Sequence, residues 1–191
     1  YGVVYNRNAG EINAYADGKQ IILTAGMYRF AETDVDLATV IAHEIAHNVQ
    51  KHIQAAATNA MLGGIFDIAA AAYGINTEAA FSKAGAKAFS KGFEAEADYV
   101  GLYLLALAGY PIEDAPEFWR KMAIAFPASI IPNHNSTHPP SAERFLNLEE
   151  TVKEINGKQL AGSPLEPNMK SWISSDSQSS SGRRKGKKAY K

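Results

Sequence analysis

Apolar positions at helical spacing mark one segment of the chain most clearly. Hydrophobic side chains recur there every three or four residues, which lines one face of an α-helix. They are Leu37, Val40, Ile41, Ile45 and Val49. The preceding residues Thr33–Asp36 have the form of a capping box, with Thr33 as the N-cap and Asp36 three residues on. The pattern therefore predicts a helix over about residues 34–52.

The first 30 residues look like short strands instead. Gly2–Tyr5 and Ala14–Ala16 are separated by polar turns, and Asp17-Gly18 is a hairpin signal that leads into Gln20–Thr24. We expect these three strands to form a small sheet.

Three more helices are predicted further along the chain. They cover residues 93–107, which Gly109 and Pro111 terminate, residues 114–125, and a segment from near Ser141 to about Ile155. The Ala-rich sequence from Gln54 to Lys91 predicts helical pieces without readable bounds, and Phe126–Pro140 reads as a loop. The expected fold class is α+β, with a small sheet packed on a helix-rich body.

Composition adds a domain boundary to this picture. The 191 residues are 46% hydrophobic and 20% charged, as in an ordinary globular domain with a tail. The net charge of −1 gives no case for a nucleic-acid partner, although residues 173–191 carry +5 and the remainder −6. Because this Ser-, Gly- and Lys-rich end cannot bury enough apolar surface to order itself, we expect a domain over 1–172 and a flexible basic tail over 173–191.

No signal peptide or transmembrane helix is visible in the sequence. The most apolar stretch, Met61–Ile75, has 15 residues and is interrupted by Asp67, which is too short for a bilayer. We interpret it as a packed helix or a flap over a cleft, and a membrane-surface or re-entrant element is the alternative. With no cysteine in the chain, any metal must be held by His, Asp or Glu.

The predicted helix over residues 34–52 carries the sequence His-Glu-Ile-Ala-His at positions 43–47. At about 100° per residue, His43 and His47 point about 40° apart, so both imidazoles can reach one ion. Glu44 lies beside that pair, where it can take a proton from a water on Zn²⁺ and pass it to the leaving amine of a peptide bond. The alternative is purely structural, with one histidine in the core and the other at the surface.

A catalytic zinc ion needs a third protein ligand, and His52 is the nearest candidate. It lies nine residues after His43, which turns it about 180° away on a continuous helix. We therefore exclude it as a ligand and expect a surface or second-layer histidine.

Glu94 is the better third ligand. Glu94 and Asp98 are four residues apart and share one helix face, while Glu96 points away. One carboxylate can bind the metal while the other orients a ligating imidazole. An exposed acidic helix face is the alternative, but the small Ala95 and Ala97 and the apolar run after them favour a buried helix.

These motifs together resemble a known family. The chain combines the motif at 43–47, Glu94 and Asp98, and Ser136–Pro140 followed by Arg144. In addition, Asn13-Ala14-Tyr15 precedes an apolar strand. The combination is similar to the gluzincin metallopeptidases of the HtpX, CAAX prenyl protease and BepA group, over about residues 6–148. The branch without membrane-embedded helices is the closer one.

The resemblance implies a zincin-like fold and a set of site residues. It implies that one Zn²⁺ is bound by His43, His47 and Glu94, that Glu44 is the general base, and that Asp98 supports His43. It implies further that His138 and Arg144 stabilise the oxyanion of the tetrahedral intermediate, with Asn13, Ala14 and Tyr15 as a substrate-binding edge strand.

Several alternatives stay open for the residues after position 130. His138 could instead be a fourth zinc ligand that holds the enzyme shut, or part of a capping loop. Arg144 could form a surface ion pair, and His134 is expected in solvent.

The leading hypothesis is a zinc metalloendopeptidase that cuts unfolded or misfolded polypeptides in protein quality control. The resemblance suggests a periplasmic or membrane-associated location, and peripheral membrane binding could use Met61–Ile75 or the basic tail. The alternative is a non-catalytic, zinc-containing chaperone or binding module, which the intact Glu44 disfavours because a structural site needs no base.

Overall fold

The computed structural model describes residues 1–80, 83, 90–127 and 142–168. Its sheet has the strand order β1-β3-β2 and consists of β1 (Gly2–Asn6), β2 (Ala14–Ala16) and β3 (Gln20–Thr24). The central β3 pairs in parallel with β1 and antiparallel with β2. Gly18, at φ +93°, makes the turn between β2 and β3, as the hairpin signal predicts. The three strands lie at the predicted positions.

Helix α1 (Ala25–Phe30) follows β3 directly, where the sequence suggested only strands. That expectation is wrong for residues 25–30. The physical reason is Thr24, which ends β3 and caps the next helix, because its hydroxyl accepts a hydrogen bond from the backbone N–H of Met27 at 3.1 Å.

Helix α2 (Asp34–Val49) begins at the predicted capping box. The Thr33 hydroxyl accepts from the Asp36 N–H at 3.0 Å, and the Asp36 carboxylate accepts from the Thr33 N–H at 3.3 Å. The predicted end at His52 is wrong. The helix ends at Val49, and Lys51 adopts a left-handed conformation (φ +58°), so the chain changes direction before His52.

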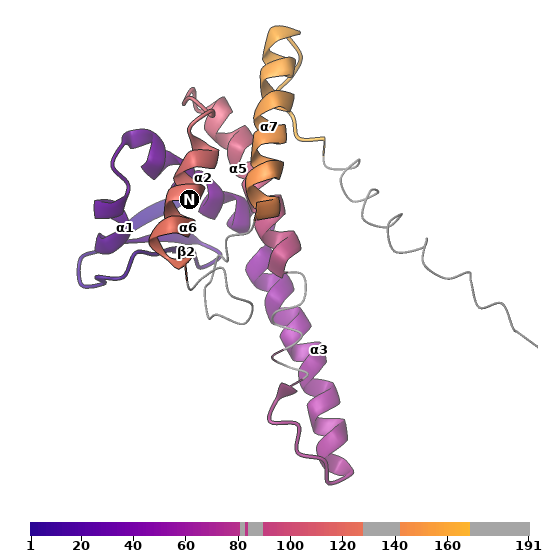
Figure 1. Cartoon of the computed structure of the whole chain (residues 1–191). Coiled ribbons are helices and arrows are strands. Elements are labelled where there is room, and N and C mark those ends of the chain that lie inside the picture. Colours follow the sequence, from indigo (N-terminus) through magenta and orange to yellow (C-terminus); the bar gives the residue numbers. More distant parts are fainter. Residues whose placement is uncertain (81–82, 84–89, 128–141, 169–191) are drawn as a thin grey trace, which may run out of the picture.

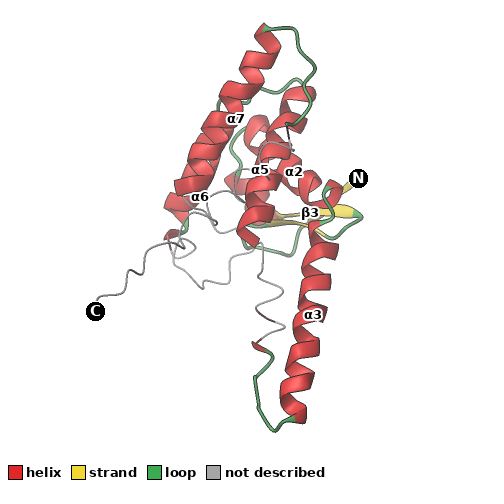
Figure 2. Cartoon of the chain, turned by 90° about the vertical axis from the view of Figure 1, so that its right-hand side faces the viewer, coloured by secondary structure: helices red, strands yellow, loops and turns green. Residues whose placement is uncertain are grey.

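Helix α3 (His52–Ala72) contains most of the apolar stretch that begins at Met61. It leaves the body of the molecule and projects from it (Figures 1 and 2). The expectation of a packed helix is wrong, since only 6% of its most apolar 18-residue portion is buried. Because the helix begins at His52, its 21 residues are long and apolar enough to cross a membrane by length and composition, contrary to the estimate from Met61–Ile75 alone.

Three further helices complete the body, namely α5 (Ser90–Leu107), α6 (Ala115–Ala125) and α7 (Ala142–Leu160). Helix α7 runs five residues beyond the predicted Ile155, through Gly157. Helix α5 packs between α2 and α7, and its Leu102, Tyr103 and Leu105 are among the most buried residues. The α+β prediction is confirmed. Residues 128–140 of the predicted loop Phe126–Pro140 and the predicted tail 173–191 lie outside the described residues.

Candidate metal centre

The site is built where α2 and α5 approach most closely. A Cβ atom added at Gly101 would lie only 3.2 Å from the Cα and N atoms of His43. Glycine at this position therefore lets the backbone of α5 run close to α2. The close approach brings acidic side chains of α5 within reach of the two histidines of α2.

His43, His47 and Glu94 are buried and converge on one point. The Nε2 atoms of the two histidines are 3.1 Å apart. The Glu94 carboxylate lies 3.4 Å from Nε2 of His43 through Oε2 and 3.3 Å from Nε2 of His47 through Oε1. A tetrahedral Zn²⁺ with bonds of about 2.0–2.1 Å separates its ligand atoms by about 3.3–3.4 Å. The three side chains thus lie close enough to bind a metal ion, and their spacing fits zinc.

Asp98 and Arg144 stand behind these ligands. Oδ1 of Asp98 lies 2.9 Å from Nδ1 of His43, the ring nitrogen that faces away from Glu94. The Arg144 guanidinium donates to both oxygens of Asp98, at 2.6 and 2.8 Å, and a further nitrogen lies 3.2 Å from Oε2 of Glu94. Its central carbon also lies 5.0 Å from the Trp119 ring centre. One buried cation is therefore shared by two buried carboxylates.

The charges of this cluster reinforce one another. Burial alone would lower the pKa of His43, but Asp98 and Glu94 outweigh it and raise that pKa to about 9. Burial would raise the pKa of Asp98, yet the charge and hydrogen bonds of Arg144, together with His43, hold it below its ordinary value. The same carboxylates raise the pKa of Arg144 against the effect of burial. In the metal-free protein the cluster is a network of paired charges.

Glu44 is also buried, at 2% exposure, beside the ligand His43. Its negative charge contributes to raising the pKa of Arg144, which places the two groups within electrostatic reach of each other. A carboxylate next to a metal-binding histidine is well placed to exchange protons with a water or a substrate at the metal.

His52 is buried behind the ligand His47, which agrees with the second-layer alternative, but its contact with Glu96 was missed because Glu96 was expected to point away. Nδ1 of His52 lies 3.0 Å from Nδ1 of His47, and Nε2 of His52 lies 3.1 Å from Oε2 of Glu96. His52 is not a member of the ligand group, but the reason given for excluding it is wrong, because α2 does not continue to residue 52. The acidic residues at the alternate positions 94, 96 and 98 were the sequence signal for a further acidic contact with the histidines. Lysine at position 51 does not predict a left-handed turn.

The remaining predicted residues divide into two groups. Arg144 is buried at 6% exposure, so a surface ion pair is excluded. The segment Asn13–Tyr15 overlaps β2 at Ala14 and Tyr15, and β2 is an edge strand of the sheet that packs near α2. His134 and His138 lie outside the described residues.

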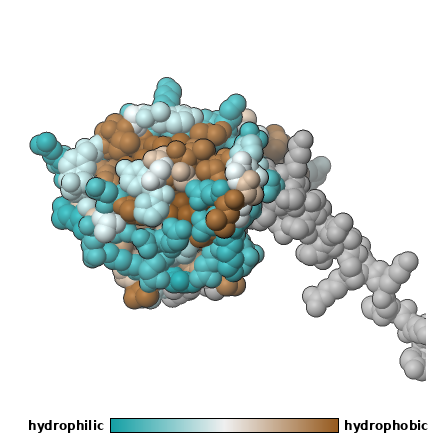
Figure 3. Space-filling view, turned by 90° about the horizontal axis from the view of Figure 1, so that it is seen from above, coloured by the Kyte–Doolittle hydropathy of each residue, from teal (hydrophilic) through white to brown (hydrophobic). Residues whose placement is uncertain are grey.

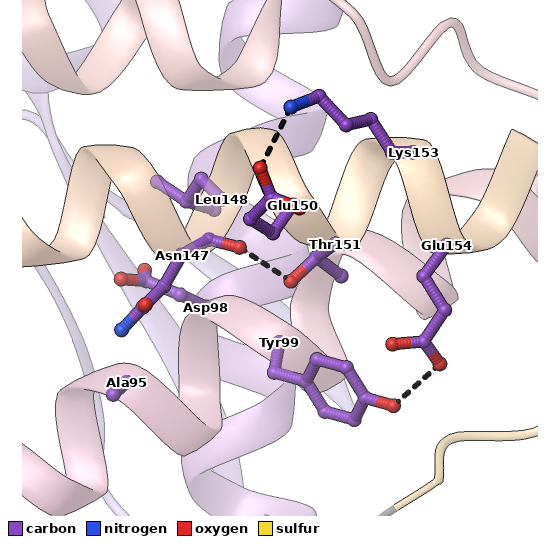
Figure 4. Close-up of a pocket in the computed structure, with 9 residues that line it drawn as sticks. All are labelled: Ala95, Asp98, Tyr99, Asn147, Leu148, Glu150, Thr151, Lys153 and Glu154. Carbon is purple, nitrogen blue, oxygen red and sulfur yellow. Dashed lines mark hydrogen bonds and ion pairs between the residues drawn. The ribbon is translucent and has the colours of Figure 1, made fainter.

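A cavity of about 450 Å³ lies between α5 and α7 (Figure 4). It is lined mainly by polar residues of α7 and by Asp98 and Tyr99 of α5, with Tyr99 donating a hydrogen bond to Glu154 at 2.8 Å. The lining reaches Asp98 but includes none of His43, His47 and Glu94. This cavity is therefore not the space in front of the metal ligands.

Comparison with known proteins gives one family and several relatives. The model of peptidase family M48 matches residues 1–152. The chain is 32% identical to the putative beta-barrel assembly-enhancing protease of Vibrio cholerae, over 78% of this chain and 34% of that protein. It is 30% identical to the beta-barrel assembly-enhancing protease of Yersinia pestis, over 83% and 36%. It is 32% identical to the mitochondrial metalloendopeptidase OMA1 of Arabidopsis thaliana, over 70% and 28%. The chain spans about a third of the length of these curated relatives.

Proposed function

We propose, because the chain belongs to peptidase family M48, that it is a zinc-dependent endopeptidase acting on unfolded or misfolded polypeptides. The observation that carries the proposal is the convergence of His43, His47 and Glu94 at zinc spacing, with the buried Glu44 beside them. A structural zinc site needs no such base, which favours catalysis over a purely structural role.

Each side chain then has a defined task. A bound zinc ion would polarise the scissile carbonyl and make a nearby water more acidic. Glu44 takes the proton from the attacking water and delivers it to the leaving amine. Asp98 accepts from Nδ1 of His43 and keeps the Nε2 lone pair of that ring directed at the metal position.

Arg144 has two possible tasks in this scheme. The sequence suggested that it stabilises the oxyanion, but its contacts with Asp98 and Glu94 favour a positioning role. By neutralising these carboxylates it lowers the cost of burying them. For His138, which the structure does not describe, a contact with the oxyanion or with the metal is proposed from the sequence alone.

Strand β2 is the proposed binding edge for an extended substrate. Asn48, the residue after His47, accepts a hydrogen bond from the Gly18 N–H at 2.8 Å and so ties the β2–β3 hairpin to the metal-binding helix. A polypeptide that pairs with Asn13–Tyr15 through its backbone would lie beside the metal with little dependence on sequence. Such pairing suits unfolded substrates, whose backbone groups are free.

The test compares the full-length protein with Glu44→Gln on a casein-like unfolded substrate. We expect Glu44→Gln to bind zinc with wild-type affinity and to lose at least about 100-fold in cleavage rate, because general-base catalysis contributes on the order of 10²–10⁴. Glu150→Gln, an exposed carboxylate paired with Lys153, is the control and should cleave normally. Equal cleavage by Glu44→Gln would exclude it as the base. A zinc-loaded wild type that cleaves nothing would favour the alternative, a zinc-containing chaperone.

We also propose that α3 associates with membranes, consistent with the periplasmic or membrane-associated location that the family resemblance suggests. Its Met61, Leu62, Ile65 and Ile68 are 54–74% exposed, in a helix that lacks a polar face wide enough to explain them. Figure 3 views the molecule from the end remote from α3 and shows hydrophilic residues over much of this face, with a hydrophobic band across it.

Flotation with phosphatidylcholine vesicles in high salt separates α3 from the basic tail, because salt screens the charges of the tail. Ile65→Lys should abolish flotation of the full-length protein. Ile124→Lys, at a still more exposed isoleucine on α6, is the control and should have no effect. Flotation that survives Ile65→Lys, or that disappears for the wild type in high salt, would exclude α3 as the anchor.

A further inference from the structure

The two metal-binding histidines differ in what holds their outer nitrogen. Asp98 lies directly at Nδ1 of His43, whereas Nδ1 of His47 faces another imidazole, that of His52. His52 in turn reaches Glu96, and Oε1 of Glu96 accepts a hydrogen bond from Nε2 of Gln50 at 2.7 Å. An unbroken chain of contacts therefore leads from Glu96 through His52 to the ligand His47.

Glu96 sets the direction of the hydrogen bonds that run from it through His52 to His47. A carboxylate only accepts, so the proton of a neutral His52 lies on Nε2. Its Nδ1 then carries a lone pair, and the 3.0 Å contact between the two Nδ1 atoms requires the proton to lie on His47. A neutral His47 with its proton on Nδ1 has its lone pair on Nε2, the atom that faces His43 and Glu94. That is the tautomer a metal needs.

Local structure holds His52 in this place. A residue five positions after His47 would lie about 140° around a continuous helix, too far for such a contact. The left-handed conformation of Lys51 ends that helix, at a cost of about 1 kcal/mol or more for a residue other than glycine. His52 is then buried at 4% exposure and stacks on Phe93, with ring centres 4.5 Å apart.

We propose that Glu96 and His52 form a positioning relay that fixes the tautomer and the ring orientation of His47. It acts on the metal ligand and does not touch the substrate. The inference rests on the proposed binding of zinc by His43, His47 and Glu94. Helix α5 then serves both histidines, His43 directly through Asp98 and His47 indirectly through Glu96.

The test measures zinc affinity of the full-length protein by competition with a chromophoric chelator. His52→Leu and Glu96→Gln should weaken binding by about 10- to 100-fold, the usual effect of removing a partner of a metal-binding histidine. His52→Asn should recover most of this loss, because its side-chain oxygen can replace Nδ1 as the acceptor. The visible absorption of the Co²⁺-loaded protein should change for His52→Leu and return towards wild type for His52→Asn.

Gln54→Leu, an exposed position in the same turn of α3, is the control and should bind zinc normally. Wild-type affinity and an unchanged Co²⁺ spectrum in His52→Leu would overturn the relay. So would an Asn variant as weak as the Leu variant, since packing alone would then explain the loss. A wild type that binds no zinc would overturn the proposed metal site itself, which distinguishes the two failures.

Discussion

Arg144→Met should destabilise the protein strongly, and more in the absence of metal than in its presence. Arg144 is buried and pairs with both Asp98 and Glu94. Methionine keeps the apolar stem of the side chain but removes one of the two cations, Arg144 and the protonated His43, that two buried carboxylates share. Removing one partner of a buried ion pair costs about 3–5 kcal/mol. For a domain of this size, each 1 kcal/mol lowers the melting temperature by about 2–4 °C, so we expect a loss of roughly 10 °C.

Thermal unfolding of the full-length protein in EDTA and in zinc measures this effect. Zinc bound to Glu94 would supply positive charge to the same cluster, so the loss in zinc should be about half that in EDTA. Arg144→Lys keeps the charge but loses the two-pronged contact with Asp98, and should fall between wild type and Arg144→Met.

The matched control is Arg120→Met. Arg120 also pairs with two acids, Glu117 and Glu149, but its side chain is 40% exposed, and exposed pairs contribute at most about 1 kcal/mol. We expect a change of a few degrees at most. If Arg144→Met unfolds in EDTA within about 2 °C of wild type, or no earlier than Arg120→Met, the shared buried cation does not stabilise the fold and the reasoning is wrong.

Three further predictions follow from the same contacts. The pKa of His43, about 9 in the metal-free protein, lies above its ordinary 6.5, so its contribution to stability is complete below about pH 6.5 and is lost as the pH rises through 9. The free energy of unfolding in EDTA should therefore fall over that pH range. Calorimetry of zinc binding in two buffers at pH 7 should show that at least one proton is released. Release of no proton would contradict the raised pKa of His43. Gly101→Ala should lower the free energy of unfolding by about 1–3 kcal/mol in urea titrations, because the added Cβ would press on the backbone of His43. The control is Gly157→Ala in α7, where the added Cβ meets no atom within 4 Å, and it should be neutral or stabilising. Thr33→Ala should cost about 1 kcal/mol through loss of the α2 cap, and an unchanged urea midpoint would show that the capping box does not stabilise α2.

Sequence patterns predicted the parts of this site that depend on local geometry. The capping box at Thr33 correctly predicted where α2 begins, and the helical repeat predicted that His43 and His47 share one face of it. The four-residue spacing of Glu94 and Asp98 likewise follows from helix geometry, so their placement on one face of α5 was predictable.

The rest depends on packing between distant segments. Arg144 lies 46 residues from Asp98 in sequence, and no local rule says that its guanidinium is buried there rather than paired at the surface. The end of α2 was not predicted because lysine does not indicate a left-handed turn. The direction of α3 and the position of His52 both depend on that conformation of Lys51. Helix α1 was not predicted because Thr24, the last residue of β3, is also the N-cap of the helix that follows.

Helices α2 and α5 pack directly on each other, although α3 lies between them in the sequence. Closing a flexible loop costs entropy that grows only with the logarithm of its length, about 0.6 kcal/mol per doubling. An insertion or a deletion in the projecting part of α3 therefore changes the ligand spacing of the site very little. We therefore expect the spacing of the metal-binding pair of helices to be independent of the length of α3, as long as the junction that seats His52 is retained.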